Sequence, residues 1–390
     1  MTNQLYAQRL RALEESLRSA GLDAYIVPMV DEFQGEYIPA YAARLPYISG
    51  FTGSAGMGII WEKTSAERRH TLFVDGRYTL QAAKEVDANE FVIVNSGDLS
   101  LAECLSIYGN TPITVGVDSW LVSMEQLRRW RQGTAHTQIK WVANRPNLID
   151  GIWKDQPAPP SGEVILHPLE YAGVSYNEKS TQLLEQLQRY QADAVLLTQP
   201  DAINWLLNIR GSDVPFNPLL LSYFLLRQNG EGTLYTFPHT LSDDVKNYLQ
   251  HHQVALADIT TLFAGNAGAL AANMRILVDP STTPQGFAEL ATAKGIILVE
   301  GEDPTQLPKA LKNPQELEGV RAAHRRDGLA LTRFLHWFAG RVESKKLFDE
   351  LEVVAQLEST RARDNNYRGA SFATIAGTGP NGAIIHYRAD

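Results

Sequence analysis

The sequence predicts an α/β protein made of two copies of one helix–strand module and a shorter third segment. Apolar residues at helical spacing over 6–17, with Gly21 after them, predict an amphipathic helix, and LDAYIVP at 22–28 follows as a strand. The same order returns with a helix over 183–190 and the strand ADAVLLT at 192–198. The apolar face of each amphipathic helix must pack against another element, so we expect sheets flanked by helices.

Further segments match between the two copies and occur in the same order along the chain. The pairs are YISGFTGS (47–54) with WLLNIRGS (205–212), TLFVD (71–75) with TLYTF (233–237), and VGVD (115–118) with ILVD (276–279). Together with the first strand of each copy, they predict a divergent repeat of about 150 residues, a common domain size.

Two proline-rich stretches separate these parts. KDQPAPPSG at 154–162 and EDPTQLPKALKNP at 302–314 cannot continue a helix or a central strand. We therefore expect domains at 1–158 and 159–305, and a third segment at 306–390 that is shorter than a typical domain.

The third segment begins with a strong helix-start signal. Asn313, Pro314 and Glu316 fit a capping box with proline in the first turn. The helix is expected to end near Gly340, and His324 lies on its apolar stripe, where a packed core histidine is the favoured interpretation over a ligand. That stripe is formed by Leu317, Val320, Leu331, Leu335 and Phe338.

The remainder of the third segment predicts one more helix and two strands. Residues 347–363 are expected to be helical, and SFATIAG (371–377) and AIIHY (383–387) to be strands around a glycine-rich turn. Side chains alternate along a strand, so Ile384 and His386 would share one face. A histidine beside isoleucine on a strand proves little by itself.

Composition excludes several classes of partner. The chain has 35 basic and 44 acidic residues, a net charge of −9 and no dense basic block, so no nucleic-acid partner is expected. The charged N-terminus has no apolar core of a secretory signal, and the longest apolar run, 219–226, is too short to span a bilayer. Cys104 is the single cysteine, which fits a reducing compartment and a buried structural role. We expect a cytoplasmic protein without a membrane partner.

Motif searches give few chemical candidates. No convincing metal-ligand spacing is present, and GSAGMG at 53–58 lacks the spacing of a dinucleotide-binding loop. Arg77 in FVDGRY could bind a peptide carboxylate or carbonyl through its fork of donors, or it could pair with Asp75. From spacing alone, the structural ion pair is the favoured interpretation.

Five blocks together resemble a known enzyme family, aminopeptidase P, the cytosolic Xaa-Pro aminopeptidases. They span the whole chain in the family's order, and WLLNIRGSDVPFNP and TGPNGAIIHY are highly specific. The blocks are YISGFTGSAG, DGRY at 75–78, INWLLNIRGSDVPFNP at 203–218, KNPQELEGVRAAHRRD at 312–327 and GTGPNGAIIHY at 377–387.

The resemblance implies two creatinase-type N-terminal α/β domains with mixed sheets, followed by a pita-bread α+β metallopeptidase domain. Such enzymes remove the first residue of peptides with proline in second position. The Xaa-Pro bond that they cleave is a tertiary amide without an N–H. In the family, two aspartates, one histidine and two glutamates hold two divalent ions, usually manganese. These ions generate the attacking hydroxide and polarise the scissile carbonyl. By the same resemblance, His386 matches an active-site histidine that hydrogen-bonds the substrate, and Arg77 matches a substrate-contacting arginine.

The same resemblance exposes a departure. The family's metal ligands all follow the TGPNGAIIHY motif, and here Asp390, the only later carboxylate, is too close to it to match the first ligand. We therefore expect an incomplete catalytic domain with no metal ligands, so that this chain alone binds no metal pair and is inactive. The alternative is a non-catalytic peptide- or protein-binding module on the same scaffold. A homodimer is possible for the complete enzyme, and prolidase and creatinase relatives share the fold.

Overall fold

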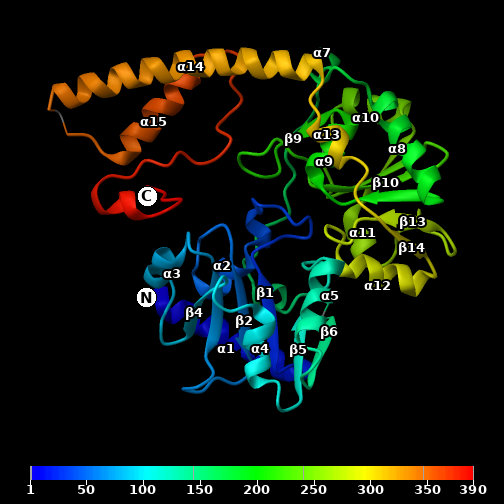
Figure 1. Cartoon of the computed structure of the whole chain (residues 1–390), viewed down its shortest axis with the longest axis vertical. Helices are drawn as coiled ribbons and strands as arrows, with labels where there is room; N and C mark the ends of the chain where they lie inside the picture. The colour runs from blue at the N-terminus through cyan, green and yellow to red at the C-terminus, as the bar shows by residue number, and fades with distance from the viewer. Residues whose placement is uncertain (1, 144, 240, 346, 390) are drawn as a thin grey trace.

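The structure is a computed structural model that describes residues 2–143, 145–239, 241–345 and 347–389; Asp390 lies outside these residues. Within them the chain forms two modules, each built on a six-stranded sheet, and a helical C-terminal segment (Figure 1). In the picture, the long helix α14 runs across the top, and the C-terminus returns to the first module beside α3. The predicted α/β architecture is confirmed.

The first module has strand order β4-β3-β2-β1-β5-β6. The pairs β1–β2 and β2–β3 are antiparallel, whereas β3–β4, β1–β5 and β5–β6 are parallel. The strands are β1 (Ala24–Pro28), β2 (Met57–Trp61), β3 (His70–Val74), β4 (Phe91–Asn95), β5 (Ile113–Val117) and β6 (Ile139–Ala143). The helices are α1 (Thr2–Ala20), α2 (Arg44–Ser49), α3 (Thr79–Glu85), α4 (Leu101–Tyr108), α5 (Met124–Gly133) and α6 (Leu148–Ile152).

The second module has the equivalent order β12-β11-β10-β8-β13-β14 and an added two-stranded sheet, β7-β9. The strands are β7 (Val164–Leu166), β8 (Ala194–Leu197), β9 (Ile209–Gly211), β10 (Ser222–Arg227), β11 (Gly232–Thr236), β12 (Val254–Asp258), β13 (Arg275–Val278) and β14 (Ile297–Glu300). The helices are α7 (Leu169–Ala172), α8 (Tyr176–Tyr190), α9 (Pro200–Leu207), α10 (Asp243–His251), α11 (Ile259–Phe263), α12 (Gln285–Lys294) and α13 (Gln306–Ala310).

The internal repeat is confirmed strand by strand. TLFVD and TLYTF become β3 and β11, and VGVD and ILVD become β5 and β13, at the same places in the two sheet orders. The senses of pairing also agree, because β10–β8 and β10–β11 are antiparallel while β11–β12, β8–β13 and β13–β14 are parallel. The first strands β1 and β8 are buried along their whole length, as expected for central strands covered by helices on both faces.

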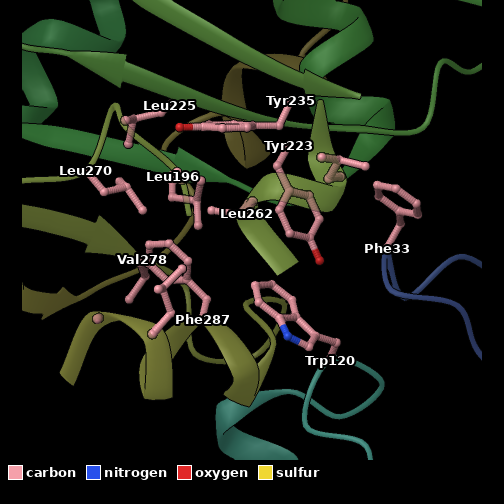
Figure 2. Close-up of a cluster of buried hydrophobic side chains, with 14 of the residues drawn as sticks. Phe33, Trp120, Leu196, Tyr223, Leu225, Tyr235, Leu262, Leu270, Val278 and Phe287 are labelled. Atoms are coloured by element: carbon pink, nitrogen blue, oxygen red, sulfur yellow. The ribbon is translucent and has the colours of Figure 1, made fainter. Parts of the chain in front are cut away.

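One hydrophobic cluster spans the interface between the two modules, in addition to the clusters within each module. Figure 2 shows Phe33 and Trp120 of the first module beside Tyr223 of the second. The rings of Phe33 and Tyr223 meet edge to face at 5.4 Å between centroids, and Trp120 stacks on Tyr223 at 6.4 Å. Backbone hydrogen bonds cross the same boundary, from Met124 N to Thr283 O at 3.0 Å and from Gly286 N to Ser119 O at 2.8 Å. Because apolar contacts and backbone hydrogen bonds both cross the interface, we expect the two modules to move as one body.

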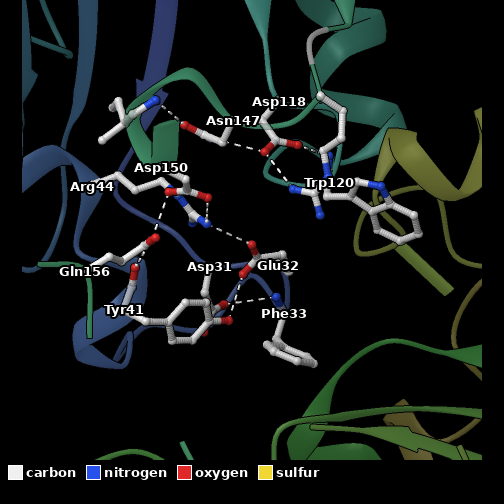
Figure 3. A network of polar contacts seen from close by, with 12 residues as sticks. Asp31, Glu32, Phe33, Tyr41, Arg44, Asp118, Trp120, Asn147, Asp150 and Gln156 are labelled. Atoms are coloured by element: carbon white, nitrogen blue, oxygen red, sulfur yellow. Dashed lines mark hydrogen bonds and ion pairs between the residues drawn. The ribbon is translucent and has the colours of Figure 1, made fainter. Parts of the chain in front are cut away.

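A buried polar network lies beside this interface (Figure 3). The Arg44 guanidinium donates from Nε and Nη2 to Asp150, at 2.8 and 2.9 Å, and from Nη2 to Glu32 Oε1 at 3.0 Å. Burial raises the pKa of Glu32, but the charges of Arg44 and Arg145 and the hydrogen bond from Tyr41 together outweigh burial, and the net pKa is lowered. Glu32 is also tied to the second module, because the Tyr223 hydroxyl donates to its backbone oxygen.

Asp31 is the exception in this network. Its Oδ1 accepts the backbone N–H groups of Phe33 and Gly35, at 3.0 and 3.1 Å, but its buried Oδ2 has no partner among the described residues. Burial raises the pKa of Asp31 to about 7, because no cation compensates the charge.

The third segment begins as predicted. Asn313 caps α14 (Pro314–Glu343): its side chain accepts from Glu316 N, and Glu316 accepts from Asn313 N, both at 2.9 Å. The helix ends three residues beyond the expected Gly340, and α15 (Glu350–Arg361) packs back against it. Cys104 is buried, as predicted.

Two expectations for this segment are wrong. Residues 371–377 and 383–387 form no strand, and a 3-10 helix spans Gly379–Ala383. A strand requires a neighbour for its N–H and C=O groups, and none of the described strands lies along these residues. His386 has φ +57°, outside the extended region, so the expected shared face with Ile384 does not arise.

His324 is exposed rather than packed. The stripe that carries it is open to solvent over much of α14, with Leu317 39% exposed and Leu335 55% exposed. The spacing predicted the apolar face correctly, but a periodic pattern does not specify what covers that face.

Candidate functional site

The structure brings the two predicted site residues to one place. His386 approaches the first module at the DGRY motif, where its Nδ1 lies 3.1 Å from the hydroxyl oxygen of Tyr78, the residue after Arg77. The two rings meet edge to face, with centroids 6.0 Å apart. Residues 308 positions apart in sequence therefore meet at the end of strand β3.

The DGRY motif forms the turn between β3 and α3. Asp75 accepts the backbone N–H of Arg77 on its carboxylate at 2.9 Å and that of Tyr78 on its carbonyl at 3.0 Å. Such an aspartate-closed turn is typical of a short strand–helix connection. The turn directs the Tyr78 ring into the module, where it is 2% exposed and packs edge to face on Phe51 at 5.8 Å.

Gly53 permits this packing. A Cβ atom at Gly53 would lie 2.8 Å from the Tyr78 ring and 2.2 Å from Phe51, closer than carbon atoms approach. The ring position is thus determined by both the aspartate turn and the glycine of GFTGS.

Arg77 forms the ion pair that spacing favoured. Its Nε donates to Asp75 Oδ1 at 3.0 Å and its Nη2 to Oδ2 at 2.7 Å, while its guanidinium lies 5.1 Å from the centre of the Tyr78 ring. The hydrogen bond from Arg77 is the main reason that the pKa of Asp75 is lowered. About a third of each side chain remains exposed, so the pair is partly open to solvent.

The sequence did not predict that Tyr78 contacts His386 or that Ser54 contacts Tyr78 behind it. Tyr78 and Ser54 are linked by a 2.6 Å hydrogen bond between their hydroxyl oxygens, and Tyr78 links onward to His386. Both residues stand inside quoted blocks, GFTGS and DGRY, so those blocks carried the signal. Nothing in the one-dimensional pattern showed that they converge.

The described residues do not assemble a site for a pair of metal ions. No three histidine, cysteine, aspartate or glutamate side chains gather closely enough to hold an ion among them. The carboxylates near the C-terminal segment have other partners: Asp75 pairs with Arg77, and Glu350 accepts from Asn381 Nδ2. This donor set does not fit a dinuclear centre.

Other candidates contribute little. His251 and His252 end α10, and His252 contacts the rings of Tyr176 and Tyr248, as expected of a helix end rather than a ligand pair. Across the described ranges, no helix combines the length and apolar character required to cross a bilayer.

Three parts of the chain match models of known families. Residues 9–145 and 155–316 each match the Creatinase/Prolidase N-terminal domain, and residues 318–390 match Metallopeptidase family M24.

Curated relatives extend over nearly the whole chain. A probable Xaa-Pro aminopeptidase P of Paracoccidioides brasiliensis strain Pb18 is 35% identical over 98% of this chain, and one of Ajellomyces capsulatus strain H143 is 34% identical over 98%. This chain spans 64% and 62% of the length of these relatives. The resemblance to aminopeptidase P is confirmed.

A solved structure agrees at the level of fold. The X-prolyl aminopeptidase of Caenorhabditis elegans, described as a cytosolic enzyme with a di-nuclear active site, superposes with a TM-score of 0.89 at 26% identity, covering 100% of this chain and 64% of that one. The chain therefore consists of two creatinase/prolidase N-terminal domains followed by residues of metallopeptidase family M24.

Proposed function

We propose that this chain is the substrate-binding portion of an Xaa-Pro aminopeptidase, which removes the first residue of cytoplasmic peptides with proline in second position. The observation that carries the proposal is the approach of His386, from the M24-matching segment, to the Arg77–Tyr78 pair of the first module. Similarity to aminopeptidase P relatives over 98% of the chain supports it. On this proposal the domains divide near residues 158 and 305.

Arg77 and His386 are assigned the substrate contacts. Asp75 occupies Nε and Nη2 of Arg77 and leaves Nη1 without a hydrogen-bond partner among the described residues. An oriented guanidinium with a free N–H suits a peptide carbonyl or carboxylate. The exposed imidazole of His386 can donate to, or accept from, an oxygen at the reacting carbonyl.

Metal chemistry is assigned to residues outside this donor set. By the family resemblance, two divalent ions, which we propose to be manganese, would supply a hydroxide and polarise the carbonyl if they were bound. The described residues do not gather the required ligands. We therefore propose that the 390-residue chain by itself binds no catalytic metal pair and hydrolyses nothing.

Peptide binding tests the proposal directly. Calorimetric titration with Ala-Pro-Ala and Ala-Ala-Ala is expected to show binding that depends on the central proline and weakens in Arg77→Lys. Arg131→Lys, at an exposed arginine of α5, is the matched control and should bind like the wild type. Equal affinity for both peptides, unaffected by Arg77→Lys, would overturn the assignment.

Hydrolysis is a separate measurement. Incubation with Ala-Pro-Ala and manganese, followed by mass spectrometry, should release no alanine from this chain alone. Sustained release that a chelator stops would contradict inactivity, yet it would support the aminopeptidase lineage. Reading the source gene beyond the codon for Asp390 tests whether ligands in the order Asp, Asp, His, Glu, Glu follow.

The second candidate is a non-catalytic peptide- or protein-binding module on this scaffold. The absence of a gathered metal-ligand set among the described residues favours it for this chain by itself. It predicts peptide or partner binding without hydrolysis even when the gene ends at Asp390. The first candidate, the aminopeptidase, also includes the proposal that the complete enzyme forms a homodimer, which sedimentation measurements would test.

A further inference from the structure

We propose that Tyr78, supported by Ser54, is a positioning residue for His386: its hydroxyl donates to Nδ1 and thereby holds the imidazole in the tautomer that carries its proton on Nε2. The proposal rests on the proposed function, in which His386 faces the substrate. Tyr78 and Ser54 of the first module would thus orient the side chain of a histidine that belongs to the M24-matching segment.

The Tyr78 hydroxyl has a fixed position. The ring is 2% exposed, Phe51 packs against it, and the backbone of Gly53 leaves no room for movement toward that side. His386, in contrast, is exposed and follows a short 3-10 helix without strand pairing. The orientation of the imidazole therefore depends on its few contacts. Among the described residues of the first module, the Tyr78 hydroxyl lies 3.1 Å from Nδ1, at hydrogen-bond distance, and the Asp75 carboxylate lies close enough for its charge to act on the ring.

The proton count allows the hydrogen bonds to run in either direction, and donor and acceptor strength favours one of them. A neutral imidazole has one donor and one acceptor nitrogen, while each hydroxyl donates one proton and accepts others. Ser54 Oγ lies 2.6 Å from Tyr78 Oη, so the serine can donate to the phenol and the phenol to Nδ1. A phenol is a better donor than an aliphatic alcohol, and an unprotonated imidazole nitrogen is a good acceptor, which favours this direction over the reverse.

The tautomer determines what His386 can do. With its proton on Nε2, the outward nitrogen donates to an oxygen, the property required to stabilise charge on a carbonyl under attack. With its proton on Nδ1, the same nitrogen would instead accept a proton as a base. The Ser54–Tyr78 pair selects the first property through atoms that do not touch the substrate.

Nitrogen-15 NMR of the imidazole rings measures the tautomer directly. The full 390-residue chain is labelled at histidine, and the His386 signals are identified by their loss in His386→Gln. Tyr78→Phe keeps the buried ring and removes only the hydroxyl, and Ser54→Ala removes its supporting donor. Tyr47→Phe is the matched control, because the Tyr47 hydroxyl donates to Ile152 O at 3.3 Å, away from His386.

In the wild type, Nδ1 of His386 is expected to resonate as an unprotonated nitrogen and Nε2 as a protonated one. Tyr78→Phe should shift the tautomer ratio roughly two- to tenfold toward Nδ1–H, the factor that one hydrogen bond supports, and Ser54→Ala by less. Tyr47→Phe should leave the ratio unchanged. A wild-type His386 protonated on Nδ1, or equal ratios in wild type and Tyr78→Phe with unchanged melting temperatures, would overturn the proposal. A failed peptide-binding or cleavage assay leaves this result unaffected, so the two proposals fail separately.

Discussion

Replacing Asp31 by asparagine is expected to flatten the dependence of stability on pH between about 4 and 7. Asp31 is fully buried beside the interface of the two modules, and its Oδ2 has no partner among the described residues. Burial raises its pKa from 3.8 to about 7, and the neighbouring Glu32 carboxylate adds to the effect. The folded protein thus holds a proton on Asp31 that the unfolded chain has released.

The sign follows from that difference in bound protons. Below pH 3.8 both states are protonated, and the stabilising contribution is fully present; as pH rises through 7, it is lost. A span of about three pH units at 1.36 kcal/mol each sets an upper limit of about 4 kcal/mol on this loss. Such a loss is a sizeable part of the 5–15 kcal/mol that is typical of a domain.

Urea unfolding followed by tryptophan fluorescence, at pH values from about 4 to 8, measures the effect across the window set by the two pKa values. The wild type should lose stability with rising pH more steeply than Asp31→Asn, whose side chain cannot ionise. Asp98→Asn, at an exposed aspartate of the same module, should keep the wild-type slope. Parallel curves for the wild type and Asp31→Asn would refute the reasoning, whatever their vertical offset.

Three further perturbations follow from named contacts. Arg44→Met removes the cation that pairs with the buried Glu32 and the partly exposed Asp150 and should cost about 3–5 kcal/mol in urea unfolding, with Arg44→Lys recovering only part because it lacks the fork; a cost below 1 kcal/mol would contradict the network. Gly286→Ala would place a Cβ 2.7 Å from the Trp120 ring and should lower the melting temperature through a cost of about 1–3 kcal/mol, whereas Gly268→Ala, with open space at its Cβ, should have little effect. Hydrogen exchange should be faster over 314–389 than in β1 and β8, and equal protection throughout would count against the exposed apolar face of α14.

The features of the fold that could be predicted were those that depend on residues close together in the sequence. Matched segments such as TLFVD and TLYTF predicted a repeat, because equal environments in two sheets select similar residues, and the strands occupy equivalent positions. Asn313 and Glu316 predicted the start of α14 because a capping box is satisfied within four residues.

The part that failed depends on partners distant in sequence. AIIHY has strand propensity, but propensity alone cannot supply a neighbouring strand. Ala383 ends a 3-10 helix, and Ile385 and His386 lie in a turn. In the same way, Arg77 and Asp75 could be paired from their spacing, whereas the contact of Tyr78 with His386 joins residues 308 positions apart. The family resemblance indicated that these residues matter, but not that Ser54 and Tyr78 connect them.

The placement of His386 depends on two anchors at opposite ends of the third segment. At the start, the Asn313 side chain donates to Ala172 O at 2.8 Å, which fixes α14 to the second module. The 30-residue helix then extends about 45 Å, and the chain returns through α15 to the Tyr78 hydroxyl of the first module. Because one hydrophobic cluster spans both modules, the distance between the two anchors is set by the interface around Trp120 and Tyr223. A substitution that loosens this interface should therefore change the environment of His386 without touching it, and Gly286→Ala examined by the same histidine NMR would reveal that coupling.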